Sequence, residues 1–250
     1  MITVIMPAYN CEKFLKQAVH SVIYQTYTDW KLIIIDDCST DGTRLLAEEL
    51  AERDKRIELL CNDQNQGVGR TRNRGIKEAE TEWIAFLDSD DAWDKEKLAK
   101  QVALTKENPA AEFVYTGSAF MRESGELMNV VFQVPERVTR RQLLKQNVIS
   151  CSSVMIKREL LLRHPMPEGK NIHEDFAVWL TVLGEIECAY GINEPLLTYR
   201  VYQGSKSGKK RKAARMNWNT YRKVGLNPLV AAYYMCWYAV RGIKKHRKLK

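Results

Sequence analysis

Short apolar runs recur along the first 120 residues, and between them apolar residues return every three or four positions. The runs predict β-strands near residues 2–6, 31–36, 57–61, 83–87 and 112–116. The segments between them predict helices near residues 11–25, 41–53, 69–79 and 94–107. This alternation predicts an α/β fold with a mostly parallel central sheet and helices on both faces.

The pattern is less regular after residue 120. Strands are predicted at 130–132 and 153–156, and helices near 139–146 and 174–184. No internal repeat and no low-complexity linker interrupts the chain. We therefore expect one main domain, residues 1–207, followed by a C-terminal extension, residues 208–250.

Two helix starts carry residue types that cap helices. Asn10 precedes the first predicted helix, and Ser39 or Thr40 precedes the second. Their side-chain oxygens are expected to accept hydrogen bonds from the first turn of each helix, with Asp41 inside the first turn of the second.

The charge of the chain is unevenly distributed. The net charge is +8, but no Asp or Glu follows Glu194, whereas 15 of the 39 Lys and Arg do. The preceding part carries 24 basic and 31 acidic residues, a net charge of −7. A basic end on an acidic body suggests contact with an anionic surface, either lipid or nucleic acid, although a solvated terminus has the same composition.

The extension contains an apolar stretch from Leu229 to Val240, flanked by Lys and Arg. Twelve residues are too few to span a bilayer as a helix. The aromatic residues of the stretch fall at helical spacing and suit a membrane interface: Tyr233, Tyr234, Trp237 and Tyr238. A helix packed on the protein body explains the same pattern, and the two interpretations are compatible.

The six cysteines are scattered and include no C-x-x-C pair, so neither a zinc site nor a disulfide framework is expected. The first residues read as a strand and lack the features of a signal peptide. These observations favour a reducing, cytoplasmic setting.

An acidic cluster, Asp88-Ser89-Asp90-Asp91, directly follows the predicted strand 83–87. Ligands of open α/β sheets bind at the carboxyl ends of strands. Crowded carboxylates repel one another, and Mg²⁺ or Mn²⁺ together with phosphate oxygens relieves that repulsion. The cluster therefore predicts a site for a metal–diphosphate, although a turn before a helix is the alternative for the cluster taken alone.

A second pair, Asp36-Asp37, ends the predicted strand 31–36. A carboxylate at this position can accept hydrogen bonds from a base or from ribose hydroxyls. Neither G-x-G-x-x-G after the first strand nor G-x-x-x-x-G-K-[ST] is present. The sequence therefore does not predict a Rossmann dinucleotide site, and a P-loop is excluded.

Six motifs then follow one another in order: Pro7-Ala8-Tyr9-Asn10, Asp36-Asp37-x-Ser39-x-Asp41, Asn65-x-Gly67 with Arg72-Asn73-x-Gly75, Asp88-x-Asp90-Asp91, Glu174-Asp175-Phe176 with Trp179-Leu180, and Tyr199-Arg200. This set resembles the family 2 glycosyltransferases of the GT-A fold, from residue 2 to about residue 207. Within that family, the first and last motifs look closest to bacterial teichuronic acid and capsular polysaccharide transferases.

The resemblance implies a role for each matching residue. Pro7, Ala8, Tyr9 and Ser89 would line the nucleotide-sugar pocket, and Asp37 would bind the uracil. Asp88 and Asp90 would hold the metal, with Asp88 near the ribose or a metal-bound water. Asp175 would be the general base, and the acceptor or sugar side would include Asp91, Glu174 and Trp179. Arg72 matches the basic residue near the base or phosphates. Arg70 adds a charge where the family often has a small residue, so either arginine could meet the phosphates.

The implied reaction is inverting, metal-dependent transfer of a sugar from a nucleoside diphosphate sugar, expected to be UDP-linked. The acceptor would be a saccharide or a polyprenyl-lipid-linked saccharide of a cell-surface polymer, and the cofactor Mn²⁺ or Mg²⁺. The enzyme would lie on the inner face of the plasma membrane, with no nucleic-acid partner.

A sugar nucleotidyltransferase and a non-catalytic polyanion-binding protein are the alternatives. The first usually has a Gly-rich loop after the first strand, which Pro7-Ala8-Tyr9-Asn10 is not.

Overall fold

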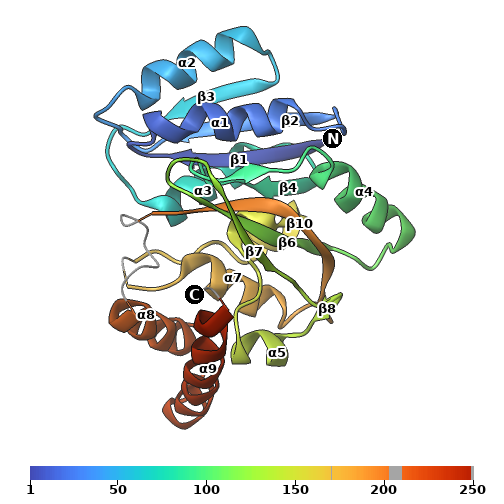
Figure 1. Cartoon of the computed structure of the whole chain (residues 1–250), viewed down its shortest axis with the longest axis vertical. Coiled ribbons are helices and arrows are strands. Elements are labelled where there is room, and N and C mark those ends of the chain that lie inside the picture. The colour runs from blue at the N-terminus through green and yellow to red at the C-terminus, as the bar shows by residue number, and fades with distance from the viewer. Residues whose placement is uncertain (170, 203–209, 249–250) are drawn as a thin grey trace.

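A computed structural model describes residues 1–169, 171–202 and 210–248, and side chains through residue 202 and from 212 to 240. One sheet runs through the molecule in the order β3-β2-β1-β4-β9-β6-β10-β5, with β7 beside β6 and β8 beside β10 (Figure 1). Its strands are β1 Ile2–Ala8, β2 Trp30–Asp36, β3 Ile57–Cys61, β4 Trp83–Phe86, β5 Ala92–Trp93, β6 Phe113–Arg122, β7 Leu127–Phe132, β8 Arg137–Val138, β9 Met155–Lys157 and β10 Ala189–Val201.

Helices surround this sheet. They are α1 Glu12–Ile23, α2 Thr43–Arg53, α3 Val68–Glu78, α4 Lys97–Glu107, α5 Arg140–Lys145, α6 Arg158–Arg163, α7 Glu174–Val182, α8 Lys210–Lys223 and α9 Pro228–Lys248, with a 3₁₀ turn at Cys151–Ser153. The α/β fold expected from the alternation of apolar patterns is confirmed.

Four strands lie side by side at one end of the sheet order and pair in parallel: β3, β2, β1 and β4. Their carboxyl ends therefore meet at one edge of the sheet. β1 extends two residues beyond the predicted strand, through Pro7 and Ala8, which pair with Ile35 and Asp36 of β2. The ends of β1 and β2 thus lie side by side where the acidic motifs begin.

Successive residues of the central strands point to opposite faces, because side chains alternate along a strand. Ile33 and Ile35 of β2 belong to one hydrophobic cluster, together with Phe176 and Trp179 of α7. Leu32 and Ile34 belong to the other cluster, which includes side chains of α1 and α2. Both faces of the sheet are covered, which explains why these strands read as continuous apolar runs.

The second half of the sheet is mixed. β9 is antiparallel to β4 and β6, whereas the long β10 is parallel to β6 with a shift in register between Ile192 and Leu197. β10 was not predicted, because Asn193, Glu194 and Pro195 interrupt its apolar pattern at that shift. The short β5 and β8 and the helix α6 were also not predicted.

The predicted capping at the first two helices is wrong. The N-cap residues are Cys11 and Gly42, and neither helix has a side-chain cap. Asn10 instead has a positive φ of 48°, and its side-chain oxygen accepts a hydrogen bond from the backbone N–H of Thr40. Asp41 lies outside the helix and accepts hydrogen bonds from the backbone N–H groups of Thr43 and Glu12.

The described part of the C-terminal extension forms α8 and α9, which pack on the body at the end of the molecule opposite α2 (Figure 1). Tyr221 and Ala231 are buried in the same cluster as α7, and the Tyr221 hydroxyl donates to the Leu144 carbonyl at 2.7 Å. The expected boundary between residues 207 and 208 lies outside the described residues and stays a prediction. Within the described ranges, no helix combines the length and apolar character needed to cross a membrane.

The six cysteines all lie in described segments and form no disulfide, as their spacing predicts.

Candidate active site

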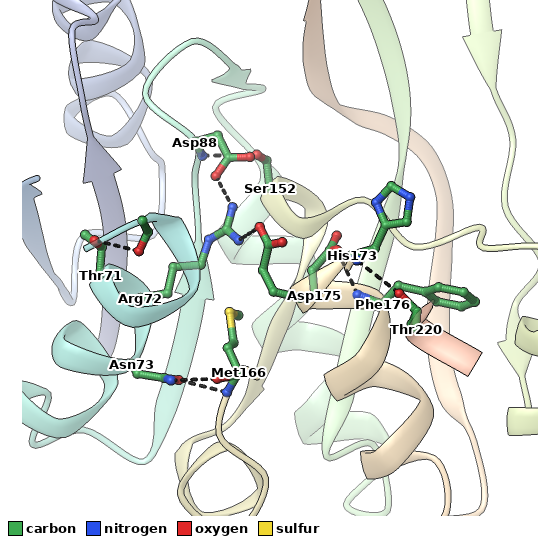
Figure 2. A network of polar contacts seen from close by, with 12 residues as sticks. Thr71, Arg72, Asn73, Asp88, Ser152, Met166, His173, Asp175, Phe176 and Thr220 are labelled. Carbon is green, nitrogen blue, oxygen red and sulfur yellow. Dashed lines mark hydrogen bonds and ion pairs between the residues drawn. The ribbon is translucent and has the colours of Figure 1, made fainter. Parts of the chain in front are cut away.

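The acidic motifs come together at the carboxyl edge of the parallel strands. Asp36 ends β2, Asp88 follows β4, and the first turn of α7 brings Glu174 and Asp175 to the same region. Figure 2 shows Asp88 and the side chains of α7 on two sides of Arg72, which comes from α3. Segments about 100 residues apart in the sequence therefore form one polar site.

Arg72 is at the centre of this site. Its side chain is only 4% exposed, and its guanidinium lies 2.5 Å from Asp88 Oδ1 and 3.4 Å from Glu174 Oε1. Burial by itself lowers the pKa of Arg72, but the negative charges of Asp88 and Glu174 outweigh it and the pKa lies well above its usual range. Its Nε is buried and has no hydrogen-bond partner among the described residues. Arg72 is thus a permanent cation between two carboxylate groups.

Asp175 lies partly buried beside this cation. Burial raises the pKa of its carboxyl, and the charge of Glu174 raises it further, whereas Arg72 and His173 act in the opposite direction. Asp175 is in the first turn of α7 but is not its N-cap, which is His173. Its Oδ1 accepts from the backbone N–H of Phe176 at 2.7 Å. A carboxylate with a raised pKa is a better proton acceptor than an ordinary aspartate.

The segment that carries Asp175 is held by the C-terminal extension. The backbone N–H of His173 donates to Thr220 Oγ1 of α8 at 3.0 Å (Figure 2). The rings of Phe176 and Tyr221 pack edge to face with centroids 5.9 Å apart. The extension therefore holds the start of α7 in place.

The carboxylates of the Asp88 cluster differ in environment. The Asp88 side chain is 31% exposed, and its backbone N–H donates to Ser152 Oγ at 3.1 Å. Asp90 is more deeply placed: burial raises the pKa of its carboxyl, the charge of Asp88 adds to this, and a hydrogen bond from Tyr202 opposes it. Two close carboxylates that are costly to ionise together fit a divalent cation.

Such a cation would need oxygen ligands beyond these two. In the described part of the chain, no group of three or more His, Cys, Asp or Glu side chains could hold a metal ion by itself. A diphosphate supplies the missing oxygens, as Mg²⁺ commonly combines one or two carboxylates with phosphate. Asp88 and Asp90 therefore fit a cation that arrives with a diphosphate ligand.

Asp91 is buried beneath the site. It accepts hydrogen bonds from Ser152 Oγ at 2.7 Å and from the backbone N–H of Arg200 at 2.9 Å. Burial, followed by the charges of Asp90 and Asp88, raises its pKa well above the usual range. It joins the end of β4 to β10 and so supports its two neighbours.

Asp37 is also buried and organises a loop. Its Oδ1 accepts from Asn62 Nδ2 at 2.7 Å and from the backbone N–H of Gln66 at 2.9 Å, and its Oδ2 accepts from the backbone N–H of Gly67 at 2.8 Å. Gly67 has a φ of 84°, which favours glycine, and is the N-cap residue of α3. Asp37 therefore connects the end of β2 to the helix that carries Arg72.

The remaining residues predicted to bind the nucleotide sugar differ in their exposure to solvent. Pro7, Ala8 and Ser89 are buried near the ends of β1 and β4, and Tyr9 is 49% exposed. Arg70 is exposed and forms an ion pair with Glu168, a different partner from the carboxylates that Arg72 contacts.

Trp179 lies in the hydrophobic core. It is fully buried, and its ring packs on Phe113 and Phe86 at centroid distances of 5.0 and 6.1 Å. Its indole N–H has no hydrogen-bond partner among the described residues.

Three residues at the site were not assigned from the sequence. Ser152 connects Asp88 and Asp91, and the Tyr202 hydroxyl bonds to Asp90. Arg200, part of a quoted motif without a role, donates from Nε to the Asp90 carbonyl at 2.8 Å and from Nη2 to Gln17 at 2.5 Å. No local pattern around Ser152 or Tyr202 signals these contacts, because their partners lie more than 60 residues away.

The sequence matches the glycosyl transferase family 2 over residues 3–162. The chain belongs to this family. It is therefore a glycosyltransferase, and the expected family is confirmed.

Several relatives match almost the whole chain, TuaG and WfgD among them. TuaG of Bacillus subtilis (strain 168), named as a teichuronic acid biosynthesis glycosyltransferase, is 37% identical over 246 residues, 98% of this chain and 97% of TuaG. WfgD of Escherichia coli is named as a UDP-Glc:alpha-D-GlcNAc-diphosphoundecaprenol beta-1,3-glucosyltransferase. It is 34% identical over 252 residues, 98% of this chain and 95% of WfgD.

The fold also matches a solved structure. TarS 1–349 of S. aureus, in complex with UDP-GlcNAc, superposes with a TM-score of 0.72 at 20% identity, covering 94% of this chain and 70% of that chain. This similarity confirms the expected fold.

Proposed function

We propose that this glycosyltransferase transfers a sugar from a UDP-sugar to an acceptor hydroxyl with inversion at the anomeric carbon, in a reaction that depends on Mn²⁺ or Mg²⁺. The observation that carries the proposal is the arrangement around Arg72. Partly exposed Asp88 lies on one side of the buried cation, and Glu174, next to Asp175, lies on the other. One side suits a metal-bound diphosphate, and the other suits a proton acceptor.

The donor would bind where β1, β2 and β4 end. Pro7, Ala8, Tyr9 and Ser89 would line its pocket, and Asp37 would contact the base. The name of WfgD supports a UDP-linked donor, since that relative is named for UDP-Glc. Because Arg72 is buried and Arg70 is exposed, Arg70 is better able to reach the diphosphate.

Asp88 and Asp90 would hold the metal together with the diphosphate. When bound, the metal would neutralise the charge that develops on the leaving diphosphate. The hydrogen bonds of Tyr202 and Arg200 to Asp90, and of Ser152 to the Asp88 backbone, would fix these two residues for that purpose.

Asp175 would take the proton of the attacking hydroxyl. A single displacement by that hydroxyl, on the face opposite the diphosphate, inverts the configuration. Glu174 would lie on the acceptor or sugar side, and Asp91 would support that side from its enclosed position next to Asp90. Trp179 would serve that side indirectly, because its ring packs on Phe113 and anchors α7 in the core.

The acceptor would be a polyprenyl-lipid-linked saccharide of a cell-surface polysaccharide. The names of TuaG and WfgD support this, since one refers to teichuronic acid and the other to a diphosphoundecaprenol-linked sugar. The enzyme would then work as a peripheral protein on the inner face of the plasma membrane.

A screen of nucleotide sugars tests the proposal. The purified chain is incubated with each UDP-sugar, a diphosphoundecaprenol-linked sugar and Mn²⁺ or Mg²⁺, and UDP release is measured with and without a chelator. Metal-dependent UDP release and a product of inverted anomeric configuration by NMR are expected. Release of pyrophosphate from a sugar phosphate and UTP would instead support a nucleotidyltransferase, and a retained configuration would contradict the mechanism.

A further inference from the structure

The outer face of α9 is an apolar surface that no other part of the described chain covers. Leu229 is 84% exposed, Tyr233 52% and Val240 54%. Spacings of four and seven residues place these three on one side of a helix. Exposed apolar side chains that gather on one face, rather than being scattered singly, mark an interaction surface.

The inner face of the same helix is already used for packing. Ala231 is fully buried, and Tyr234 and Met235 pack against the cluster that contains Tyr221 of α8. The Tyr221 and Tyr234 rings lie 6.3 Å apart. The inward-facing side chains of the stretch therefore hold α9 on the body. This packing does not explain why the outward-facing side chains are also apolar.

The sequence is basic on both sides of this apolar stretch. Arg222 and Lys223, at the end of α8, are exposed just before α9. The last two turns of α9 contain Arg241, Lys244, Lys245, Arg247 and Lys248, and no acidic residue occurs after Glu194. A second copy of this face, paired in either direction, would bring basic ends near basic ends.

We propose that this face of α9 docks on an anionic lipid surface, with Leu229, Tyr233 and Val240 inserted at the level of the headgroups. Basic residues at both ends of an apolar stripe complement anionic headgroups, and tyrosine favours the interface. The stretch Leu229–Val240 covers about 18 Å as a helix, whereas the hydrocarbon core is about 30 Å thick, so α9 lies along the surface.

This inference rests on the proposed function, since a lipid-linked acceptor is presented at such a surface. It adds a physical connection to the site. α8 packs against α9. It also holds the segment before Asp175 through the hydrogen bond between Thr220 and His173. The docked helix pair therefore keeps the proposed base in a fixed position relative to the membrane.

The test is sedimentation of the full chain with vesicles of phosphatidylcholine containing phosphatidylglycerol, and with vesicles of phosphatidylcholine alone. The variant replaces the exposed face: Leu229→Ser, Tyr233→Ser and Val240→Ser together. A matched control replaces exposed residues on other elements: Tyr24→Ser, Leu45→Ser and Leu162→Ser, which are 69%, 64% and 45% exposed. Circular dichroism melts are used to check that both triple variants fold.

The wild type and the control are expected to bind anionic vesicles more strongly than neutral ones, and less at high salt. The α9 variant is expected to lose roughly a hundred-fold in partitioning, because three apolar side chains no longer leave water. Equal binding of the α9 variant and the control would overturn the proposal. A concentration-dependent dimer that only the α9 variant abolishes, with no vesicle binding, would also overturn it and assign the face to a second copy.

UDP-sugar binding is measured on the same proteins to separate the two proposals. If metal-dependent binding of UDP-sugar persists while vesicle binding is absent, the docking proposal fails and the proposed function stands. If vesicle binding is confirmed and no UDP-sugar binds, the proposed function fails while the surface assignment holds.

Discussion

The guanidinium of Arg72 donates a hydrogen bond to the carboxylate of Asp88 at 2.5 Å, in an ion pair whose arginine is almost fully buried. The same guanidinium reaches Glu174 at the start of α7. One residue of α3 thereby joins the end of β4, where the donor is proposed to bind, to the helix that carries the proposed base. This connection makes Arg72 important for both the stability and the chemistry of the site.

Replacing Arg72 is expected to destabilise the protein strongly. Arg72→Met leaves Asp88, Glu174 and Asp175 without their buried cation, and removing one partner of a buried ion pair typically costs about 3–5 kcal/mol. Arg163→Met, the same substitution in an exposed ion pair with Glu185, is the control and should leave stability nearly unchanged. Urea unfolding measures both, and equal midpoints would contradict the structural importance of Arg72.

The pH dependence of transfer is expected to report on Asp175. A general base works only when it is deprotonated, so activity should rise with pH through the pKa of Asp175, which burial and Glu174 raise above the usual aspartate value. Removing the positive charge of Arg72 raises that pKa further. The acid limb of the kcat profile should therefore move to higher pH in Arg72→Met. The assay is run without urea, at a temperature where the variant is folded. An acid limb that stays or moves to lower pH would exclude Asp175 as the titrating base.

Two aspartates are expected to affect nucleotide binding in different ways. Asp90→Ala removes a proposed metal ligand, so UDP affinity should fall chiefly when Mn²⁺ or Mg²⁺ is present. Asp37→Ala removes three hydrogen-bond acceptor contacts that hold the loop before α3, so UDP affinity should fall with or without metal. Calorimetric titration separates the cases, and unchanged metal-dependent affinity in Asp90→Ala would remove Asp90 from the metal site.

Gly75 is expected to be required for the packing of α3 on the sheet. A Cβ at this position would lie 2.8 Å from Ile5 Cγ2 and 3.0 Å from Ile35 Cδ1. Alanine within a helix normally stabilises it by about 0.5–1 kcal/mol relative to glycine. Overpacking a core instead costs about 1–3 kcal/mol, so Gly75→Ala should destabilise. Because the two effects differ in sign, a higher thermal midpoint for this variant would refute the close approach.

The parallel half of the sheet and its acidic edge could be predicted from the sequence. β1, β2 and β4 are buried on both faces, so each reads as a nearly continuous apolar run that ends where the site begins. The fold class followed from that regularity. β10 could not be predicted in this way, since it is interrupted at Pro195 and is held in place by β6, about 80 residues away in the sequence.

The positions of site residues within the sheet edge were less predictable. Asp88, Asp90 and Asp91 are neighbours in the sequence, yet only Asp91 is fully enclosed, because Ser152 and Arg200 close over it. The burial of Arg72 depends likewise on α7, a distant segment. Of the two interpretations of Leu229–Val240, packing on the body is confirmed on one side of α9, and contact with a membrane interface stays a prediction for the exposed side.

The central claim is that Asp175 accepts the proton of the attacking hydroxyl while other residues hold the donor, and Asp175→Asn tests it most directly. The amide keeps the size of the side chain but cannot accept the proton. Transfer should fall by about 10²–10⁴-fold, whereas metal-dependent UDP-sugar affinity, measured by calorimetry on the same preparation, should stay within about two-fold of wild type because the donor contacts remain. A folded Asp175→Asn enzyme with near wild-type turnover, or one that has lost donor binding along with transfer, would contradict the account.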